Sequence, residues 1–201
     1  MNSGSQVILV TSTKKGEGKT FTILSLAYSL SLLNKKVLII DTNFRNNSLT
    51  KLLIARPNFQ KMLQEQGEVK LLTSPNTEPF DGTNVNSSGN NIISKTSDKN
   101  IDVIGSNTGM DSPSEILAGR DFKNVVNQLR GTYDYIFMEG SSLNDFSDTK
   151  ELMMFADSMI SVFSAHSVLK QIDKESINYM RNLNGKFLGA ILNQVDAKEV
   201  L

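Results

Sequence analysis

The sequence contains no cysteine and only one histidine among its 201 residues. Without cysteine the chain can form neither disulfides nor thiolate metal sites, and a single histidine cannot supply a zinc-binding cluster. Any bound metal ion must therefore be held by oxygen ligands, as magnesium is. The lack of cysteine also fits a reducing, cytoplasmic setting.

An excess of charge and a long apolar run are missing too. The 21 Lys and Arg residues balance 21 Asp and Glu residues, which argues against a nucleic-acid partner because such proteins carry basic surfaces. No apolar run approaches a membrane span, and the polar start Met1–Ser5 is neither a signal peptide nor a targeting helix. The chain begins at its first predicted strand and stops soon after its last, which suggests a piece of a longer protein.

The strongest pattern is the segment Thr11–Thr20, TSTKKGEGKT, which follows the apolar run Val7–Val10 and leads into a helical pattern. This order of strand, glycine-rich loop and helix is typical of a phosphate-binding P-loop. Glycines let backbone N–H groups turn toward phosphate oxygens, Lys19 can neutralise the outer phosphates, and the Thr20 hydroxyl can bind magnesium. Because Thr13 stands where the usual pattern has glycine, a glycine-rich turn that only caps a helix is the alternative.

Strand patterns alternate with helix patterns along the whole chain. Strands are predicted at residues 7–10, 37–40, 101–104, 135–138, 159–163 and 187–192, and helices at 19–34, 59–66, 112–131, 152–155 and 169–184. The helix at 112–131 starts with a capping box at Ser112–Glu115. The first helix is predicted to be largely buried, and the last to turn Leu169, Ile172, Met180 and Leu183 inward.

This alternation predicts one α/β domain over residues 1–201, a doubly wound, mainly parallel sheet with helices on both faces, as in P-loop NTPases. The polar segment 73–100 is predicted to be a mobile loop within it. In such a sheet Asp41 and Glu139, which follow apolar strands, share one rim with the P-loop. Asp41 can organise magnesium or accept a proton, or it can cap a helix or turn; Glu139 is a second carboxylate or a solvated charge at a strand end.

Segments along nearly the whole chain resemble the cytoplasmic ATP-binding domain of bacterial tyrosine kinases of capsular and exopolysaccharide synthesis, which are related to MinD/ParA-type ATPases. The segments are Val10–Thr20, similar to Walker A; Val37–Arg45, similar to Walker A′; Ile101–Ile104 with Ser112–Leu117, ahead of a central helix; Tyr133–Glu139, in the place of Walker B; and Gly189–Asp196, similar to the closing strand beside adenine.

Two of these segments depart from the family pattern. Walker A′ usually reads Asp-any-Asp-any-Arg, and here Asn43 replaces the second aspartate while Asp41 and Arg45 remain. Walker B usually ends in aspartate, a small residue and two prolines, and here it ends in Glu139-Gly140-Ser141-Ser142. Because magnesium demands near-ideal octahedral geometry, we expect metal affinity and phosphoryl transfer to suffer more than nucleotide binding.

The resemblance implies Mg-ATP as cofactor and a set of site residues. It implies catalytic roles for Lys19, Asp41 and Glu139, magnesium ligation by Thr20, Asp41 and Glu139, and nucleotide contacts from Lys15, Gly16, Glu17, Gly18, Lys19, Thr20, Phe21 and Asn193. It also implies homo-oligomers of the full-length protein and a membrane polysaccharide co-polymerase segment or adaptor as partner, at the inner face of the bacterial inner membrane.

Three functions stay open at this point. The first is phosphoryl transfer to tyrosine. The second is a degenerate regulatory module of the export machinery, favoured by Asn43 and the altered Walker B segment. The third is a MinD/ParA-like ATPase: Lys14 stands at that family's signature lysine, although it can equally be a surface lysine, and Arg45 with Ser112–Leu117 argues against this reading.

Overall fold

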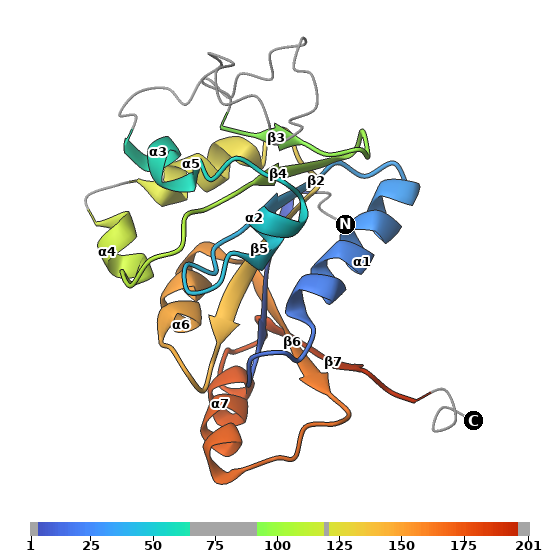
Figure 1. Ribbon diagram of the computed structural model, residues 1–201, viewed down its shortest axis with the longest axis vertical. Coiled ribbons are helices and arrows are strands. Elements are labelled where there is room, and N and C mark those ends of the chain that lie inside the picture. The colour runs from blue at the N-terminus through green and yellow to red at the C-terminus, as the bar shows by residue number, and fades with distance from the viewer. Residues whose placement is uncertain (1–3, 65–91, 119–120, 197–201) are drawn as a thin grey trace.

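The computed structural model describes residues 4–64, 92–118 and 121–196, which form a layered α/β domain (Figure 1). Its sheet has seven strands in the order β3-β4-β2-β5-β1-β6-β7, and all described pairings are parallel except that of β3 with β4. The strands are β1 Gln6–Ser12, β2 Val37–Ile40, β3 Ser94–Lys95, β4 Ile101–Ile104, β5 Tyr135–Ser142, β6 Ser158–Ser164 and β7 Phe187–Asn193. The predicted mainly parallel sheet is confirmed.

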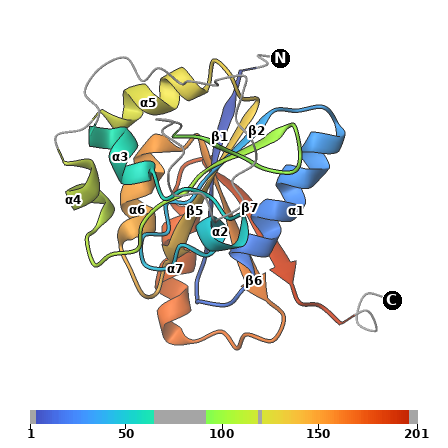
Figure 2. The ribbon, with the colours of Figure 1, turned by 45° about the horizontal axis from the view of Figure 1, so that its top comes forward.

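Helices cover both faces of this sheet, as the sequence predicts (Figure 2). They are α1 Lys19–Leu32, α2 Ser48–Leu52, α3 Phe59–Gln64, α4 Pro113–Leu117, α5 Phe122–Leu129, α6 Asp148–Leu152, the 3₁₀ turn η1 Met153–Phe155, and α7 Gln171–Arg181. Alternate residues of each strand pack to opposite sides, so Leu9 joins the core under α3 and α5 while Val10 joins the core under α1. All four residues of β2 are fully buried, as expected for a central strand covered on both faces.

The capping box predicted at the start of α4 is present. The Ser112 hydroxyl accepts a hydrogen bond from the Glu115 amide, and the Glu115 carboxylate accepts one from the Ser112 amide. Pro113 is the first helical residue, where its missing N–H costs nothing. Local sequence therefore supplies both hydrogen bonds of this cap, but the predicted helix does not run on to Gly131, since α4 ends at Leu117 and α5 begins at Phe122.

The prediction that α1 is largely buried is wrong. Phe21, Tyr28 and Leu32 are 66%, 57% and 66% exposed, because only one side of this outer-layer helix reaches the sheet. The prediction for the last helix is also wrong in part, since Leu169 and Ile172 are 63% and 49% exposed. Met180 is buried as predicted, and Leu183 packs partly against the core.

Two segment boundaries differ from expectation. Strand β5 does not end at Glu139-Gly140, as predicted, but continues to Ser142, which pairs with Ser12 of β1. The segment Gly140-Ser141-Ser142 lacks proline and so keeps the N–H groups that strand pairing needs. Within the predicted loop 73–100, Ser94 and Lys95 form β3, and residues 73–91 lie outside the described residues.

Candidate functional site

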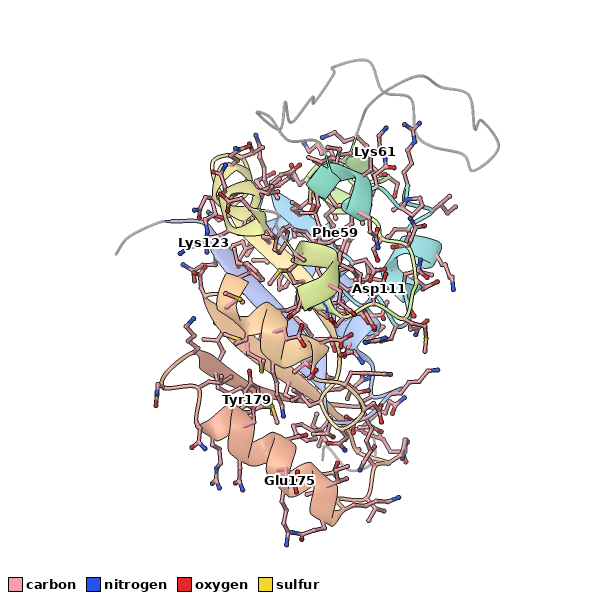
Figure 3. All side chains as sticks on the ribbon, turned by 90° about the vertical axis from the view of Figure 1, so that its left-hand side faces the viewer. Phe59, Lys61, Asp111, Lys123, Glu175 and Tyr179 are labelled. Carbon is pink, nitrogen blue, oxygen red and sulfur yellow. The ribbon has the colours of Figure 1, made fainter. Side chains whose placement is uncertain are left out.

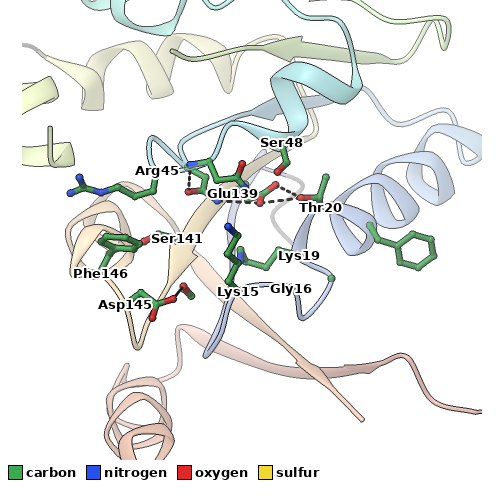
Figure 4. A pocket seen from close by; sticks show the side chains of 15 residues that line it. Lys15, Gly16, Lys19, Thr20, Arg45, Ser48, Glu139, Ser141, Asp145 and Phe146 are labelled. Carbon is green, nitrogen blue, oxygen red and sulfur yellow. Dashed lines mark hydrogen bonds between the residues drawn. The ribbon is translucent and has the colours of Figure 1, made fainter. Parts of the chain in front are cut away.

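A cavity of about 640 Å³ opens where the carboxyl ends of β1, β2 and β5 meet (Figure 4). Three segments form its wall: the P-loop with the start of α1, the chain after β2, and the chain around the end of β5. The lining residues are Lys15, Gly16, Gly18, Lys19, Thr20, Phe21, Asn43, Arg45, Asn46, Ser48, Glu139, Ser141, Ser142, Asp145 and Phe146. This volume is typical of small-molecule and cofactor sites.

The P-loop depends on two glycines with left-handed backbone conformation. Gly16 has φ 85° and Gly18 has φ 99°, values that side-chain-bearing residues rarely adopt. At Gly18 there is also no room, since a Cβ atom would lie 1.9 Å from Nδ2 of Asn193. The Asn193 amide donates to the backbone oxygen of Glu17 at 3.2 Å. Asn193 therefore supports the P-loop from behind, and it is not among the residues that line the cavity.

We expect Gly18→Ala to lower the free energy of unfolding by about 2 kcal/mol, through backbone strain and the collision with Asn193. In Gly18→Ala/Asn193→Ala the collision is gone and only the strain remains. Urea unfolding of the wild type, both single variants and the double variant measures the coupling of the two changes. Strictly additive effects would contradict the close approach of these two residues.

Lys19 is nearly buried at the base of the cavity, with 7% of its surface exposed. Its Nζ atom donates to the Ser12 hydroxyl at 3.0 Å, which fixes the direction of the side chain. Burial lowers the pKa of Lys19, while the negative charges of Glu139, Glu17 and Asp145 oppose that shift. A cation deprived of water in this way gains strongly from an incoming phosphate.

Thr20 and Glu139 form the second polar contact of the cavity. The Thr20 hydroxyl lies 3.1 Å from Oε1 and 3.0 Å from Oε2 of Glu139 and donates to this carboxylate. The side-chain Nδ2 of Asn43 donates to Oε1 of Glu139 at 3.4 Å. Burial raises the pKa of Glu139 to about 7, and the charge of Asp41 adds to the shift. Lys19 and the hydrogen bonds from Thr20 and Asn43 act in the opposite direction.

These oxygen atoms suit magnesium. A hydroxyl that gives its proton to a carboxylate keeps its lone pairs for a cation, so Thr20 and Glu139 together can hold an ion at the cavity wall. The described residues hold no group of three or more His, Cys, Asp or Glu side chains arranged for a metal. Magnesium bound here would therefore complete its coordination with phosphate oxygens and water, as it commonly does.

Asp41 lies beside Glu139 but directs its carboxylate elsewhere. It is fully buried, and Oδ2 accepts from the Thr50 amide at 2.9 Å and from the Thr50 hydroxyl at 2.6 Å. Burial raises the pKa of Asp41 to about 6, although the hydrogen bonds from Thr50 and from the backbone N–H of Asn43 oppose the shift. Because Thr50 is in the first turn of α2, Asp41 caps that helix, and it does not line the cavity.

Glu17 also faces away from the cavity. Its Oε2 atom accepts from the Thr13 hydroxyl at 3.1 Å and from the Lys14 amide at 2.8 Å, and only 1% of Glu17 is exposed. Thr13, which stands where the usual P-loop has glycine, thus ties the loop to Glu17. Lys15, Gly16 and Phe21, three other predicted nucleotide contacts, do line the cavity.

Sequence reasoning missed the cavity residues that follow β5, and it assigned no contact to Arg45. The Arg45 guanidinium pairs with the buried Asp148, Nε to Oδ2 at 2.9 Å, and lies 4.8 Å from the ring centre of Phe146. Asp145 and Phe146 line the same wall. The available signal was the missing prolines of the Walker B segment, which allow β5 to continue and bring these residues to the cavity.

Lys14 is held within its own chain. Its Nζ atom lies 2.9 Å from Oδ2 of Asp173 and donates to the Val168 carbonyl at 2.7 Å. Asp173 is buried, and its Oδ1 atom also accepts a hydrogen bond from the side-chain Nδ2 of Asn144 at 2.6 Å. Burial by itself would raise the pKa of Asp173, but hydrogen bonds from the Lys170 amide, Lys14 and Asn144 lower it below its ordinary value.

We expect Lys14→Met to cost about 2 kcal/mol of unfolding free energy, because Asp173 would stay buried without its cation. Lys14→Met/Asp173→Asn should recover most of the loss. Chemical unfolding of the three variants beside the wild type measures both effects. If Lys14→Met unfolds like the wild type and yet stops turnover, the lysine acts outside its own chain and the ion pair is incidental.

A family model described as AAA domain matches residues 5–185 of the chain. Tyrosine-protein kinase CpsD of Streptococcus pneumoniae is 26% identical over 191 residues, which are 95% of this chain and 77% of CpsD. Succinoglycan biosynthesis transport protein ExoP of Rhizobium meliloti is 24% identical over 198 residues, 98% of this chain and 23% of ExoP. These relatives confirm the resemblance to bacterial tyrosine kinases of polysaccharide synthesis.

Solved structures share the fold. The kinase domain of Escherichia coli tyrosine kinase ETK matches with a TM-score of 0.75 at 18% identity, over 98% of this chain and 70% of that chain. Other structures with this fold contain bound ADP and magnesium. The predicted P-loop NTPase fold is confirmed. Within the described ranges, no helix has both the length and the apolar character to cross a membrane.

Proposed function

The chain belongs to the AAA domain family, and from this premise we propose that it binds Mg-ATP and transfers the γ-phosphoryl group to tyrosine, as the ATP-binding domain of a bacterial tyrosine kinase in capsular or exopolysaccharide synthesis and export. The observation that carries the proposal is the contact of the Thr20 hydroxyl with Glu139, beside Lys19, on the wall of a cavity built by a P-loop.

In this proposal, different residues of the cavity bind the phosphates and the magnesium ion. Lys19 and the exposed Lys15 neutralise phosphate oxygens, and the N–H groups around Gly16 and Gly18 bind them. Thr20 and Glu139 hold magnesium, which when bound neutralises charge that develops on the phosphates. Because phosphoryl transfer relies mainly on positioning and charge neutralisation, a rigid loop supported by Glu17 and Asn193 suits it.

The partners follow from the same proposal. We expect the chain to work at the cytoplasmic face of the bacterial inner membrane with a polysaccharide co-polymerase segment or adaptor, and to form homo-oligomers in its full-length form. The name of ExoP, a succinoglycan biosynthesis transport protein, supports a role in polysaccharide export. The balanced charge of the sequence supports the absence of a nucleic-acid partner.

A regulatory module that binds nucleotide without transferring phosphate is the second candidate. The observation in its favour is the shortage of carboxylates at the cavity: Asp41 is turned into α2, and position 43 carries a neutral amide. An ATPase that uses Lys14 across a dimer is less well supported, because Asp173 and the Val168 carbonyl already bind this lysine.

One assay separates these functions. The chain is incubated with γ-labelled ATP, magnesium and a tyrosine-containing polypeptide, with EDTA in a parallel sample. If the chain is a kinase, we expect labelled phosphate on tyrosine, and EDTA should abolish this labelling. Phosphate release without labelled tyrosine would mean an ATPase, and nucleotide binding by calorimetry with neither product would mean the regulatory module.

A further inference from the structure

Among the described residues that line the cavity, only Glu139 and Asp145 are acidic. Glu139 is 2% exposed and both of its oxygens lie within hydrogen-bond distance of the Thr20 hydroxyl. Asp145 differs, because its side chain is exposed on the cavity wall, where Figure 4 shows it near Ser141 and Phe146. Asp145 is therefore the cavity carboxylate that an incoming substrate can reach.

The position of Asp145 is fixed by the extension of β5 along the P-loop. The Leu143 amide donates to the Ser12 carbonyl at 2.8 Å, and the Asn144 amide donates to the Thr13 carbonyl at 3.1 Å. The Ser142 hydroxyl then donates to the Asp145 carboxylate. Lys19 donates to the side chain of the same Ser12, so these hydrogen bonds hold Lys19 and Asp145 near each other at the cavity. The negative charge of Asp145 accordingly favours the charged form of Lys19.

Position 43, where the resemblance leads us to expect a second Walker A′ aspartate, is an asparagine, and the Asp41 carboxylate faces Thr50 of α2. We propose that Asp145 takes over as the group that orients the acceptor hydroxyl and receives its proton during phosphoryl transfer. This inference rests on the proposed function and adds a catalytic residue to it. Phe146 follows Asp145 in the chain and lines the same cavity, and the Arg45 guanidinium lies 4.8 Å from its ring centre, so a phenolic acceptor beside Asp145 can pack against this pair.

The reaction step balances as follows. The oxygen of the acceptor hydroxyl forms a bond to the γ-phosphorus, and the bond from this phosphorus to the oxygen bridging the β- and γ-phosphates breaks. ADP leaves with that electron pair. The hydroxyl proton passes to a carboxylate oxygen of Asp145 and from there to water, so the carboxylate is regenerated and no further reactant is needed.

The test compares the wild-type chain with Asp145→Asn, Asp145→Glu and Glu175→Gln. Glu175 is an exposed acid on α7 outside the cavity, so Glu175→Gln removes the same charge elsewhere (Figure 3). We expect Asp145→Asn to lower kcat for tyrosine phosphorylation about 10²-fold while KM for ATP stays within about threefold, the range expected for loss of a general base. Asp145→Glu should recover part of kcat, and Glu175→Gln should match the wild type.

A second acceptor shows whether the effect is proton transfer. With a peptide that carries fluorinated tyrosine, whose phenol is more acidic, the defect of Asp145→Asn should shrink to less than about tenfold because the phenolate forms without a base. An equal defect with both peptides, or unchanged kcat in Asp145→Asn, overturns the role of Asp145 and leaves the proposed function intact. A wild-type chain that neither labels tyrosine nor releases phosphate overturns both.

Discussion

Glu139→Gln is expected to lower magnesium-dependent phosphoryl transfer by about 10³-fold, because it removes the buried negative charge that pairs with Thr20 at the metal position. Glutamine has nearly the same shape and can still accept the hydrogen bond from Thr20. The loss should therefore fall on magnesium dependence rather than on the fold. A titration of activity against magnesium, at saturating ATP, measures it.

The same variant should be more stable than the wild type at alkaline pH. Glu139 has a pKa of about 7 in the folded chain, above the ordinary glutamate value, so folding favours its neutral form. The stability that this preference provides is complete below about pH 4 and is lost as the pH rises through 7. Glutamine is neutral at every pH. The free energy of unfolding of Glu139→Gln should therefore exceed that of the wild type by about 3 kcal/mol at pH 8 and by little at pH 4.

Urea unfolding at pH 4, 6 and 8 without nucleotide or magnesium tests this difference. Asp41, with a pKa of about 6, contributes a dependence of the same sign, so some slope should remain in Glu139→Gln. Glu175→Gln, on the exposed side of α7, is the matched control and should follow the wild type. If Glu139→Gln and the wild type lose stability in parallel from pH 4 to pH 8, Glu139 is charged throughout and its assigned environment is wrong.

Lys19→Met is expected to weaken ATP binding about 10²-fold and to reduce phosphoryl transfer to background. Lys19 is 7% exposed and its ammonium group donates to the Ser12 hydroxyl, so a bound phosphate is the partner that compensates the burial of its charge. Methionine fills a similar volume and leaves the cavity without its central cation. Isothermal titration with ATP and with ADP measures the loss.

The loss should be larger for ATP than for ADP, because Lys19 serves the outer phosphates. Lys15→Met is the matched control: Lys15 also lines the cavity but is solvent-exposed, and screening by water and salt limits its contribution to about 1 kcal/mol. Equal effects of the two variants on ATP binding would contradict the central place given to Lys19. Unfolding curves should show Lys19→Met at least as stable as the wild type, since burial penalises the lysine charge.

Residues that look alike in the sequence take different roles in the structure, so the sequence predicts only part of the site. Asp41 and Glu139 both follow apolar runs, which predicts that they share one rim of the sheet, and both are buried. Yet Glu139 meets Thr20, while Asp41 meets Thr50 in a short helix that no pattern predicted. Asn193 likewise lies at the P-loop, but it supports Glu17 from behind instead of lining the cavity.

By itself the sequence determined the order of strands and helices, the P-loop and the start of α4, because apolar runs, glycines and capping residues act over a few neighbouring positions. It also placed Lys19, Thr20 and Glu139 at one site, since parallel strands end at a common edge. Only the tertiary structure decided the direction of Asp41, the pairing of Lys14 with Asp173, and the arrival of Asp145 at the cavity. These depend on partners distant along the chain, and which partner a polar side chain meets is settled by packing and burial rather than by local pattern.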